Sequence, residues 1–389
     1  MMATGTASRV LQLQCPVCEH SFRVTEVNTF ARCEHCGENP LLTTYNLEGL
    51  TIHDIDQTTR SMWRYAALLP LLDQRNKVTL GEGWTPILKA ERLSKRYHLS
   101  NLFIKDESAN PTGSFKARGL SMAVSKALEL GIETCIVPTA GNAGGALSAY
   151  CAKAGMKAIV VMPRHTPVAF KKECTFFGAE VIEVDGLISD CAKKVAQLKQ
   201  LQPCFDISTM KEPYRLEGKK TMGYEIAEQF NWVLPDVILY PTGGGTGLIG
   251  MWKAFQEMKT MGWVSEKMPR MVAVQAQNCM PVVLSFEQRH EHSKNYCGKA
   301  TFANGLAVPN PFAEKLILQT LCESRGTAIA VSDPEIQAAM KEISSAEGIL
   351  ISPEGAALLP ALLQLIEQGV IDSDEKILLL NTGSGYKYL

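Results

Sequence analysis

The chain has 389 residues, of which 46% are hydrophobic and 20% are charged, so it is long enough to form two or three domains with full cores. Its formal net charge of -1 gives no electrostatic reason to expect nucleic acid or an anionic membrane as a partner. The sequence has no long uninterrupted apolar run, and its first ten residues lack the apolar core of a signal peptide. We therefore expect a cytoplasmic protein.

Four of the 12 cysteines form two Cys-x-x-Cys knuckles near the start of the chain. Cys15 and Cys18 belong to the first knuckle, Cys33 and Cys36 to the second, and 14 residues separate them. Four thiolates are the ligand set of a closed, structural zinc site. We predict a zinc-ribbon-like module over residues 1–50; the alternatives are a ribbon that has lost its metal, or cysteines that merely pack. The other cysteines are predicted to be buried small hydrophobes.

One lysine stands where a helix is predicted to begin, in the segment NPTGSFKARG at residues 110–119. A strand over 102–105 precedes it, a Pro-Thr-Gly turn breaks the chain, and Ser114 is predicted to cap the helix. A helix N-terminus carries partial positive charge, so it disfavours an ammonium group and lowers the pKa of the amine. A nucleophilic amine needs such a lowered pKa. Lys116 is therefore the candidate catalytic residue, and the alternative is a solvated surface lysine.

Short apolar segments alternate with segments of helical periodicity from residue 134 onward. This alternation predicts an α/β fold with two doubly wound, mostly parallel domains, in which ligands bind at the carboxyl ends of strands. The predicted strands are 134–138, 158–162, 180–184, 204–208, 237–240, 271–275, 328–331 and 377–380, and the predicted helices are 144–154, 168–177, 190–201, 216–230, 248–258, 334–347 and 355–367.

Three loops follow predicted strands. In PTAGNAGG at 138–145, small residues allow backbone amides to approach an anion such as a carboxylate. PTGGGTG at 241–247 exposes a row of amides at a helix start, which suits a phosphate. It also contains GxGxxG, but the next strand ends in Gln275 and Gln277 instead of an acid, so a monophosphate is favoured over a dinucleotide. NTGSG at 381–385 places two hydroxyls on a glycine-rich turn.

These parts together resemble the site of the fold type II, tryptophan synthase β-like, pyridoxal-phosphate enzymes, and most closely the threonine synthases, some of which have a similar N-terminal ribbon. The resemblance implies a cofactor between a large cofactor domain (51–115 and 211–389) and a smaller substrate-side domain (116–210). The motifs that carry it occur in the family's order: GEGWTP (81–86), NPTGSFKARG (110–119), PTAGNAGG (138–145), YRLEGKKT (214–221), PTGGGTG (241–247), SPEGAA (352–357) and NTGSG (381–385).

The resemblance also implies roles for individual residues. Lys116 would form the Schiff base with the cofactor aldehyde and, once displaced by substrate, move protons at the α-carbon. Asn142 would bond the ring hydroxyl. Thr382 would face the ring nitrogen and, being neutral, leave it largely unprotonated, which suits elimination and replacement. The cofactor phosphate would be held by Gly243, Gly244, Gly245, Thr246 and Gly247, and the substrate carboxylate by the amides of Thr139, Ala140, Gly141 and Ala143.

The implied reaction is a γ-replacement that converts O-phospho-L-homoserine and water to L-threonine and phosphate, in a homodimer. Two positions depart from the family pattern: Glu212 stands where many members have an asparagine that helps hold the substrate phosphate, and Lys193 stands in place of an arginine. A glutamate beside a dianion is repulsive. A serine or threonine ammonia-lyase, a β-replacement enzyme such as a cysteate or cysteine synthase, and a non-catalytic binding protein remain alternatives.

Overall fold

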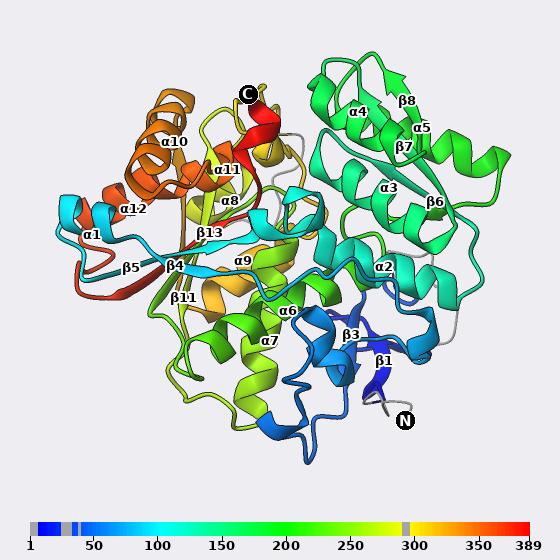
Figure 1. The fold of residues 1–389 in the computed structure, drawn as a ribbon, viewed down its shortest axis with the longest axis horizontal. Helices are drawn as coiled ribbons and strands as arrows, with labels where there is room; N and C mark the ends of the chain where they lie inside the picture. Colours follow the sequence, from blue (N-terminus) through cyan, green and yellow to red (C-terminus); the bar gives the residue numbers. More distant parts are fainter. Residues whose placement is uncertain (1–6, 25–32, 38–39, 290–295) are drawn as a thin grey trace. The chain divides into compact units, whose positions relative to one another are not determined.

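The computed structural model describes residues 7–24, 33–37, 40–289 and 296–389 (Figure 1). The chain forms two compact units. The first unit comprises Met1–Trp84, Asn110–Thr112 and Lys116–Thr221, and the second comprises Thr85–Ala109, Gly113–Phe115 and Met222–Leu389. Among the helices of the described residues, none has the length and apolar character needed to cross a membrane. The predicted α/β fold is confirmed; the division into three domains stays a prediction.

The first unit begins with a small antiparallel sheet in the order β2-β1-β3. Its strands are β1 (Val10–Gln14), β2 (Ser21–Phe22) and β3 (Leu42–Tyr45). A small core of Leu13, Leu41 and two of the knuckle cysteines lies beside them. Short 3-10 helices follow at Ile52–Asp54, Met62–Leu68 and Gln74–Asn76.

A parallel sheet in the order β8-β7-β6-β9 forms the rest of the first unit. Ile136, Ile159 and Val161 on its strands pack against Cys191 and Val195 of α5. The alternating apolar strands and amphipathic helices of the sequence produce this arrangement. The strands are β6 (Thr134–Pro138), β7 (Lys157–Pro163), β8 (Glu180–Val184) and β9 (Phe205–Asp206), and the helices are α2 (Lys116–Glu129), α3 (Asn142–Ala154), α4 (Val168–Phe176), α5 (Ile188–Leu201) and the first turns of α6 (Tyr214–Gln229).

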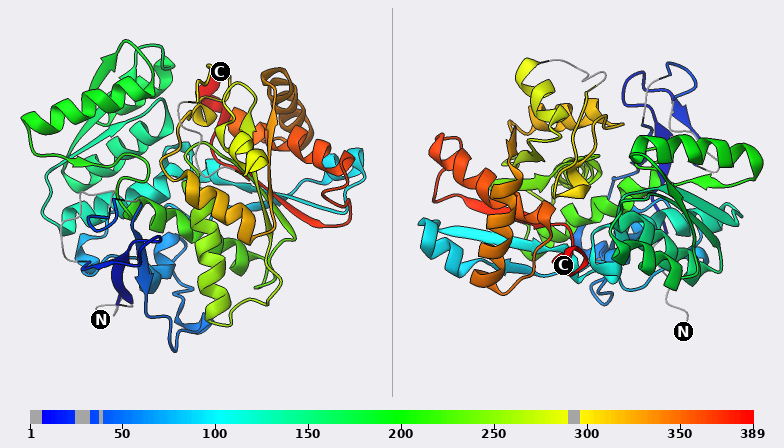
Figure 2. Two further views of the ribbon diagram at one scale, coloured as in Figure 1. Left: turned by 180° about the vertical axis from the view of Figure 1, so that it is seen from behind. Right: turned by 90° about the horizontal axis from the view of Figure 1, so that it is seen from above.

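The second unit contains a six-stranded sheet in the order β12-β11-β10-β13-β5-β4, in which only the edge strand β4 pairs antiparallel (Figure 2). Its core packs Leu239, Val274 and Leu379 of the strands against Leu358 and Leu362 of α12. The strands are β4 (Ile87–Lys89), β5 (Asn101–Asp106), β10 (Val237–Pro241), β11 (Arg270–Ala276), β12 (Thr327–Val331) and β13 (Lys376–Asn381), and the helices are α1 (Glu91–Tyr97), α7 (Thr246–Thr260), α8 (Pro281–Gln288), α9 (Glu314–Glu323), α10 (Asp333–Glu347), α11 (Pro353–Ala356) and α12 (Leu358–Glu367).

The strand order brings two of the predicted loops and the segment before Lys116 to one edge of this sheet. Strand β13 lies between β10 and β5 and runs parallel to both, with Leu379 opposite Leu239 and Asn381 opposite Asp106. The loops that leave the carboxyl ends of these strands therefore start side by side, at the edge where ligands bind in parallel sheets. They are the glycine-rich loop after β10, the turn after β13 and the segment that leads from β5 toward Lys116.

Candidate active site

Lys116 is the first residue of α2 and is half-buried. Phe115, which precedes it, donates its amide to the carbonyl of Thr382 at 3.1 Å, and its ring meets the Tyr240 ring edge-on at 6.1 Å. Ser114 pairs with Gly383 through an antiparallel bridge. The turn from which Lys116 emerges is thus fixed by the ends of β10 and β13. Thr382, which is predicted to face the ring nitrogen, lies beside the segment that carries the lysine.

The predicted cap at Ser114 is wrong. The Ser114 hydroxyl is completely buried and makes no hydrogen bond within the described chain, and the Ser114 backbone pairs with Gly383. A buried polar atom that lacks a partner is rare in folded proteins and is costly. This hydroxyl, two residues before Lys116, is therefore a group that a bound ligand can satisfy.

The loop after β10 is built as an anion cradle. The Thr242 amide donates to Val274 O at 2.8 Å, and the Gln275 side chain donates to Thr242 O at 3.0 Å, so the start of the loop is fixed. Within the described part of the chain, the amides of Gly243, Gly244 and Gly245 donate to no protein acceptor. They precede the first residue of α7, where the helix dipole favours an anion.

A side chain on Gly243, Gly245 or Gly247 of this cradle would clash with its surroundings. A Cβ on Gly243 would lie 2.3 Å from Gly305 O, and one on Gly247 would lie 2.1 Å from the Tyr240 hydroxyl. Gly245 has a φ of +72°, and a Cβ there would lie 2.3 Å from Ile317. The close backbone and unused amides fit a phosphate group. A dinucleotide site would have an acidic residue near the end of the next strand to bind a ribose. This chain has Gln275 there, and its side chain is bonded to the loop, which agrees with the monophosphate prediction.

The loop after β6 leads into α3, whose first residue is Asn142. The Thr139 amide is bonded to Val161 O at 2.9 Å, and the Gly141 amide is bonded to the Thr139 hydroxyl at 3.1 Å. The amides of Ala140 and Ala143, in contrast, have no acceptor among the described residues. Of the four amides predicted to bind a carboxylate, these two are available to a ligand.

Three charged residues are buried at the start of α6: Glu212 is 2% exposed, and Arg215 and Lys219 are 0% exposed. Oε2 of Glu212 accepts the amides of Tyr214 at 2.7 Å and Arg215 at 2.9 Å, so this carboxylate caps α6. Arg215 donates from Nη1 to Ile207 O at 2.6 Å. Its Nε and Nη2, and Oε1 of Glu212, have no hydrogen-bond partner within the described chain. We call these three residues the α6 charge cluster.

The α6 charge cluster lies against the first turns of α2. A Cβ on Gly119 would lie 2.9 Å from Arg215 O and 3.1 Å from Lys219 Cε, and one on Gly218 would lie 2.2 Å from Arg118 O. The backbones of the two helices therefore lie in close contact near the N-terminus of α2, where Lys116 is the first residue. Glycine at both positions permits this approach.

Burial dominates the titration of the α6 charge cluster. It raises the pKa of Glu212 to about 8, against the opposing effect of the Arg215 guanidinium and the two capping amides. Burial also lowers the pKa of Lys219 well below its usual value, and the positive charges of Arg215 and Lys116 lower it further. Lys219 is thus within electrostatic reach of Lys116.

Lys193, the other departure from the family pattern, does not belong to this cluster. It lies on α5 with its side chain 75% exposed and donates to Asp190 at 2.9 Å. A solvated ion pair of this kind contributes little to stability or to binding.

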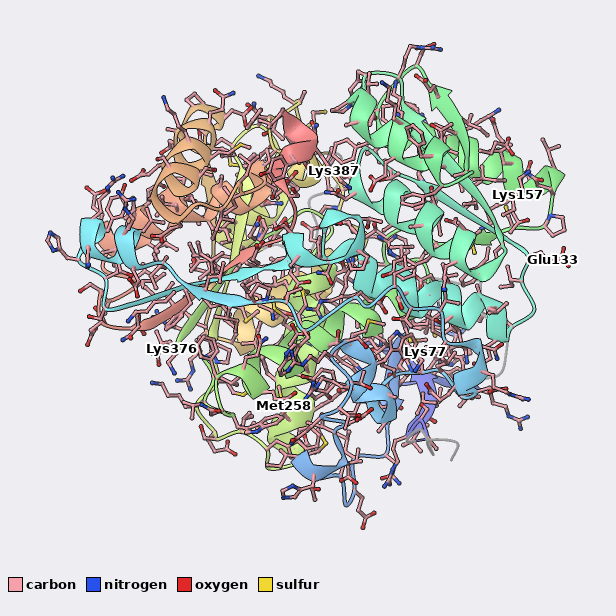
Figure 3. The ribbon with its side chains drawn as sticks, in the orientation of Figure 1. Lys77, Glu133, Lys157, Met258, Lys376 and Lys387 are labelled. Atoms are coloured by element: carbon pink, nitrogen blue, oxygen red, sulfur yellow. The ribbon has the colours of Figure 1, made fainter. Side chains whose placement is uncertain are left out.

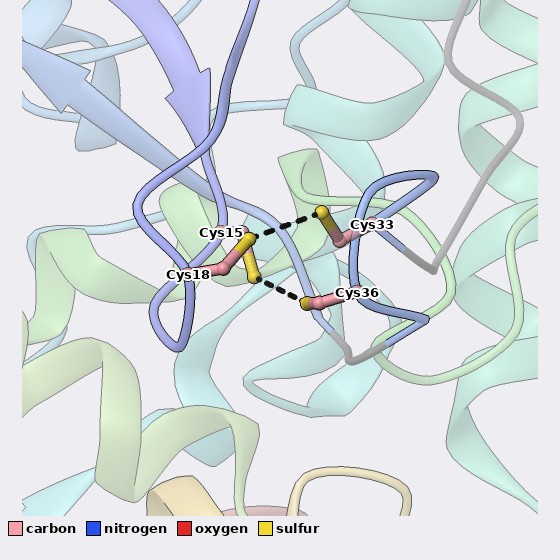
Figure 4. Close-up of side chains that lie close together, drawn as sticks. All are labelled: Cys15, Cys18, Cys33 and Cys36. Atoms are coloured by element: carbon pink, nitrogen blue, oxygen red, sulfur yellow. Dashed lines mark hydrogen bonds between the residues drawn. The ribbon is translucent and has the colours of Figure 1, made fainter.

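The four knuckle cysteines converge, as their spacing predicts (Figure 4). Sγ of Cys15 lies 3.6 Å from that of Cys36, Sγ of Cys18 lies 3.5 Å from that of Cys33, and all four lie within 4.8 Å of one another. A tetrahedral site with zinc–sulfur bonds of about 2.3 Å places its sulfurs about 3.8 Å apart. The cluster can therefore hold a metal ion of this size.

Purified protein is expected to contain about one zinc per chain, and its removal by a chelator should lower the free energy of unfolding by several kcal/mol. Because the metal has no open position, binding of the cofactor should change little. Elemental analysis and thermal unfolding test this, with Cys15→Ser expected to lose the metal and Cys322→Ser, an exposed cysteine away from the cluster, expected to keep it. Metal-free protein after growth in zinc-replete medium would contradict the prediction.

The α/β fold with parallel sheets is that of the pyridoxal-phosphate proteins of fold type II. The sequence matches the pyridoxal-phosphate dependent enzymes over residues 78–383, and the chain belongs to this family. The resemblance predicted from the motifs is confirmed.

Relatives and solved structures agree with this family. The chain is 37% identical to a threonine synthase of Methanocaldococcus jannaschii, over 84% of this chain and 80% of the relative. It is 34% identical to a threonine synthase of Methanosarcina acetivorans, over 95% of this chain and 91% of the relative. Maize serine racemase shares the fold, with a TM-score of 0.67 at 21% identity over 77% of this chain and 88% of that structure.

Proposed function

We propose that this protein is a pyridoxal-phosphate-dependent threonine synthase, a lyase that converts O-phospho-L-homoserine and water to L-threonine and phosphate. The observation that carries the proposal is the 34% identity to a threonine synthase over 95% of the chain. The geometry supports it, because the described residues provide a lysine at a helix start, a phosphate cradle and a neutral threonine at the last strand end.

Lys116 is proposed to be the residue that would hold the cofactor through its amine and would remove and return protons at the substrate's carbon atoms. When bound, pyridoxal phosphate supplies the electron sink that makes these protons acidic. Thr382 would present a hydroxyl in place of a carboxylate to the ring nitrogen, and Asn142 would bond the ring hydroxyl. Neutral groups here favour elimination and replacement over transamination.

Two anion sites are proposed within the loops. The amides from Gly243 to Gly247, with Thr246 at the start of α7, bind the cofactor phosphate. The loop that contains Thr139 and Gly141 binds the substrate carboxylate, with the unused amides of Ala140 and Ala143 as its donors. Both sites rely on backbone donors, which need no reorganisation when the anion arrives.

The α6 charge cluster is proposed to receive the phosphate of the substrate. The unpaired Nε and Nη2 of Arg215 form the edge of a guanidinium that binds phosphate in a bidentate manner, and Lys219 adds positive charge. Above its pKa of about 8, the ionised Glu212 offsets part of this charge and competes with a dianion. The site therefore binds phosphate less tightly than one with an amide at this position.

Glu212 also favours a second candidate function, a serine or threonine ammonia-lyase, because a buried carboxylate would reject phosphorylated substrates. The β-replacement alternative has no comparable feature in its favour.

To distinguish these functions, the protein is incubated with O-phospho-L-homoserine, L-serine, L-threonine and O-phospho-L-serine while phosphate, ammonia and amino-acid products are followed together. We expect phosphate and threonine from the first compound, and slower ammonia release from serine or threonine. Ammonia release without any reaction of O-phospho-L-homoserine would establish the lyase instead.

We further propose that zinc is the metal of the cysteine cluster, that the protein is a cytoplasmic homodimer, and that residues 1–50, 51–115 with 211–389, and 116–210 act as ribbon module, cofactor domain and substrate-side domain. The proposed partners are small amino acids, with no nucleic acid or membrane. Size-exclusion chromatography with light scattering tests the dimer.

A further inference from the structure

One carboxylate in the second unit joins two segments that are far apart in the sequence. Glu354, in α11, is 6% exposed and accepts the Gly305 amide on Oε1 at 2.8 Å. The Tyr388 hydroxyl lies 2.9 Å from the same oxygen and 3.2 Å from Oε2. Hydrogen bonds to a buried carboxylate are stronger than neutral ones, so Glu354 holds both segments in place.

Gly305 forms the back of the phosphate cradle. Its carbonyl oxygen stands 2.3 Å from the point that a Cβ on Gly243 would occupy. Gly305 also packs closely against Glu354, because a Cβ on Gly305 would lie 2.8 Å from Oε1 of Glu354. The order of contact is therefore Glu354, then Gly305, then Gly243, and the three residues are closely packed.

Tyr388 anchors the C-terminal segment, which includes the short helix Gly385–Tyr388, to this chain of contacts. The Ser384 amide donates to Gly113 O at 2.9 Å, in the turn before Lys116, and a Cβ on Gly113 would lie 3.6 Å from Cε of Lys387 (Figure 3). Burial, with the Glu354 charge as a further cause, raises the pKa of Tyr388 well above its usual value. Its hydroxyl therefore stays protonated and donates to Glu354.

We propose that Glu354 and Tyr388 are positioning residues for the cofactor phosphate. Tyr388 fixes the Glu354 carboxylate, Glu354 fixes Gly305, and Gly305 sets the place of the Gly243 amide in the cradle. Neither side chain needs to touch the cofactor. This inference rests on the proposed role of the loop from Gly243 to Gly247 in binding the phosphate.

The test compares two ligands that differ only in the phosphate, pyridoxal 5'-phosphate and pyridoxal. Their dissociation constants are measured by absorbance titration of the full chain and of Tyr388→Phe, Glu354→Gln and Tyr386→Phe. Tyr388→Phe and Glu354→Gln should weaken pyridoxal phosphate by about tenfold, the effect of one lost charge-assisted hydrogen bond, and leave pyridoxal unchanged. Tyr386, whose side chain is 74% exposed in the same segment, is the matched control and should change neither.

Gly243→Ala separates failure of this inference from failure of the cradle itself. If Tyr388→Phe and Glu354→Gln keep the wild-type preference for the phosphorylated ligand while Gly243→Ala loses it, the cradle stands and the positioning role is overturned. Equal weakening of both ligands would also overturn it, since that result indicates a general structural role. If Gly243→Ala keeps the preference as well, the phosphate is bound elsewhere. Thermal unfolding of each variant confirms that folded proteins are compared.

Discussion

Lys116→Ala is expected to lower the turnover number by at least about 10³-fold, because it removes the amine that is proposed to hold the cofactor and to move protons. The variant should still bind pyridoxal phosphate, since the cradle after β10 is separate from the amine. Steady-state phosphate release from O-phospho-L-homoserine measures the loss, and absorbance titration measures the retained binding.

Lys126→Ala is the matched control for this substitution. Lys126 lies on the same helix, is buried, and is paired with Glu129 at 2.5 Å. Its loss should lower the free energy of unfolding while turnover by the folded protein is maintained. Wild-type turnover by Lys116→Ala would show that another lysine serves the reaction.

Glu212→Asn is expected to lower the Michaelis constant for O-phospho-L-homoserine by about 10- to 100-fold above pH 8. A carboxylate about 5 Å from a phosphate costs a few kcal/mol at an effective dielectric constant of about 20, and the substitution removes this repulsion. Asparagine also caps helices well, so α6 should remain intact. Initial rates over a range of substrate concentrations give the Michaelis constant.

The pH dependence should distinguish this electrostatic effect from a change in shape. Glu212 has a pKa of about 8, so the Michaelis constant of the wild type should rise between pH 7 and 9 as the carboxyl ionises, and that of Glu212→Asn should rise less.

The raised pKa of Glu212 should also make the stability of the protein depend on pH. Between its unfolded pKa of about 4.3 and its folded pKa, Glu212 holds a proton that the unfolded chain has lost, so the free energy of unfolding falls as the pH rises through this window. Glu212→Asn should lose this contribution.

Glu217→Gln is the control on the same helix. Glu217 is buried and is bonded to Tyr45 at 2.6 Å and to Lys220 at 2.6 Å. Its replacement should destabilise the protein without altering the Michaelis constant or its pH dependence. A Glu212→Asn variant that matches the wild type in both would place Glu212 outside the substrate site.

The regular α/β part of the fold is readable from the sequence because each buried strand is short, apolar and followed by a periodic helix. Strands β6 and β8 have the predicted bounds, Thr134–Pro138 and Glu180–Val184. The predicted helix over 355–367 is interrupted at Ala357 between α11 and α12. Helices α1, α8 and α9 were not predicted, and no side-chain cap marks the start of any of them.

The candidate site, too, could be predicted from the sequence only where the signals are local. Glycine-rich loops and the cysteine spacing are local signals, so the cradle and the thiolate cluster are predictable. The sequence cannot show that Glu212 turns inward to cap α6, because this depends on burial against α2. Nor does it reveal that Glu354, within the SPEGAA motif, meets Tyr388 and Gly305, since those contacts join residues far apart in the chain.

The most direct test of the central claim is to reduce the cofactor-loaded protein with borohydride and map the modified residue by peptide mass spectrometry. We expect loss of the visible absorption and a pyridoxyl adduct on the peptide that contains Lys116, in a yield that approaches one per chain. An adduct on a different lysine, or none, would contradict the assignment of Lys116 and the site built around it.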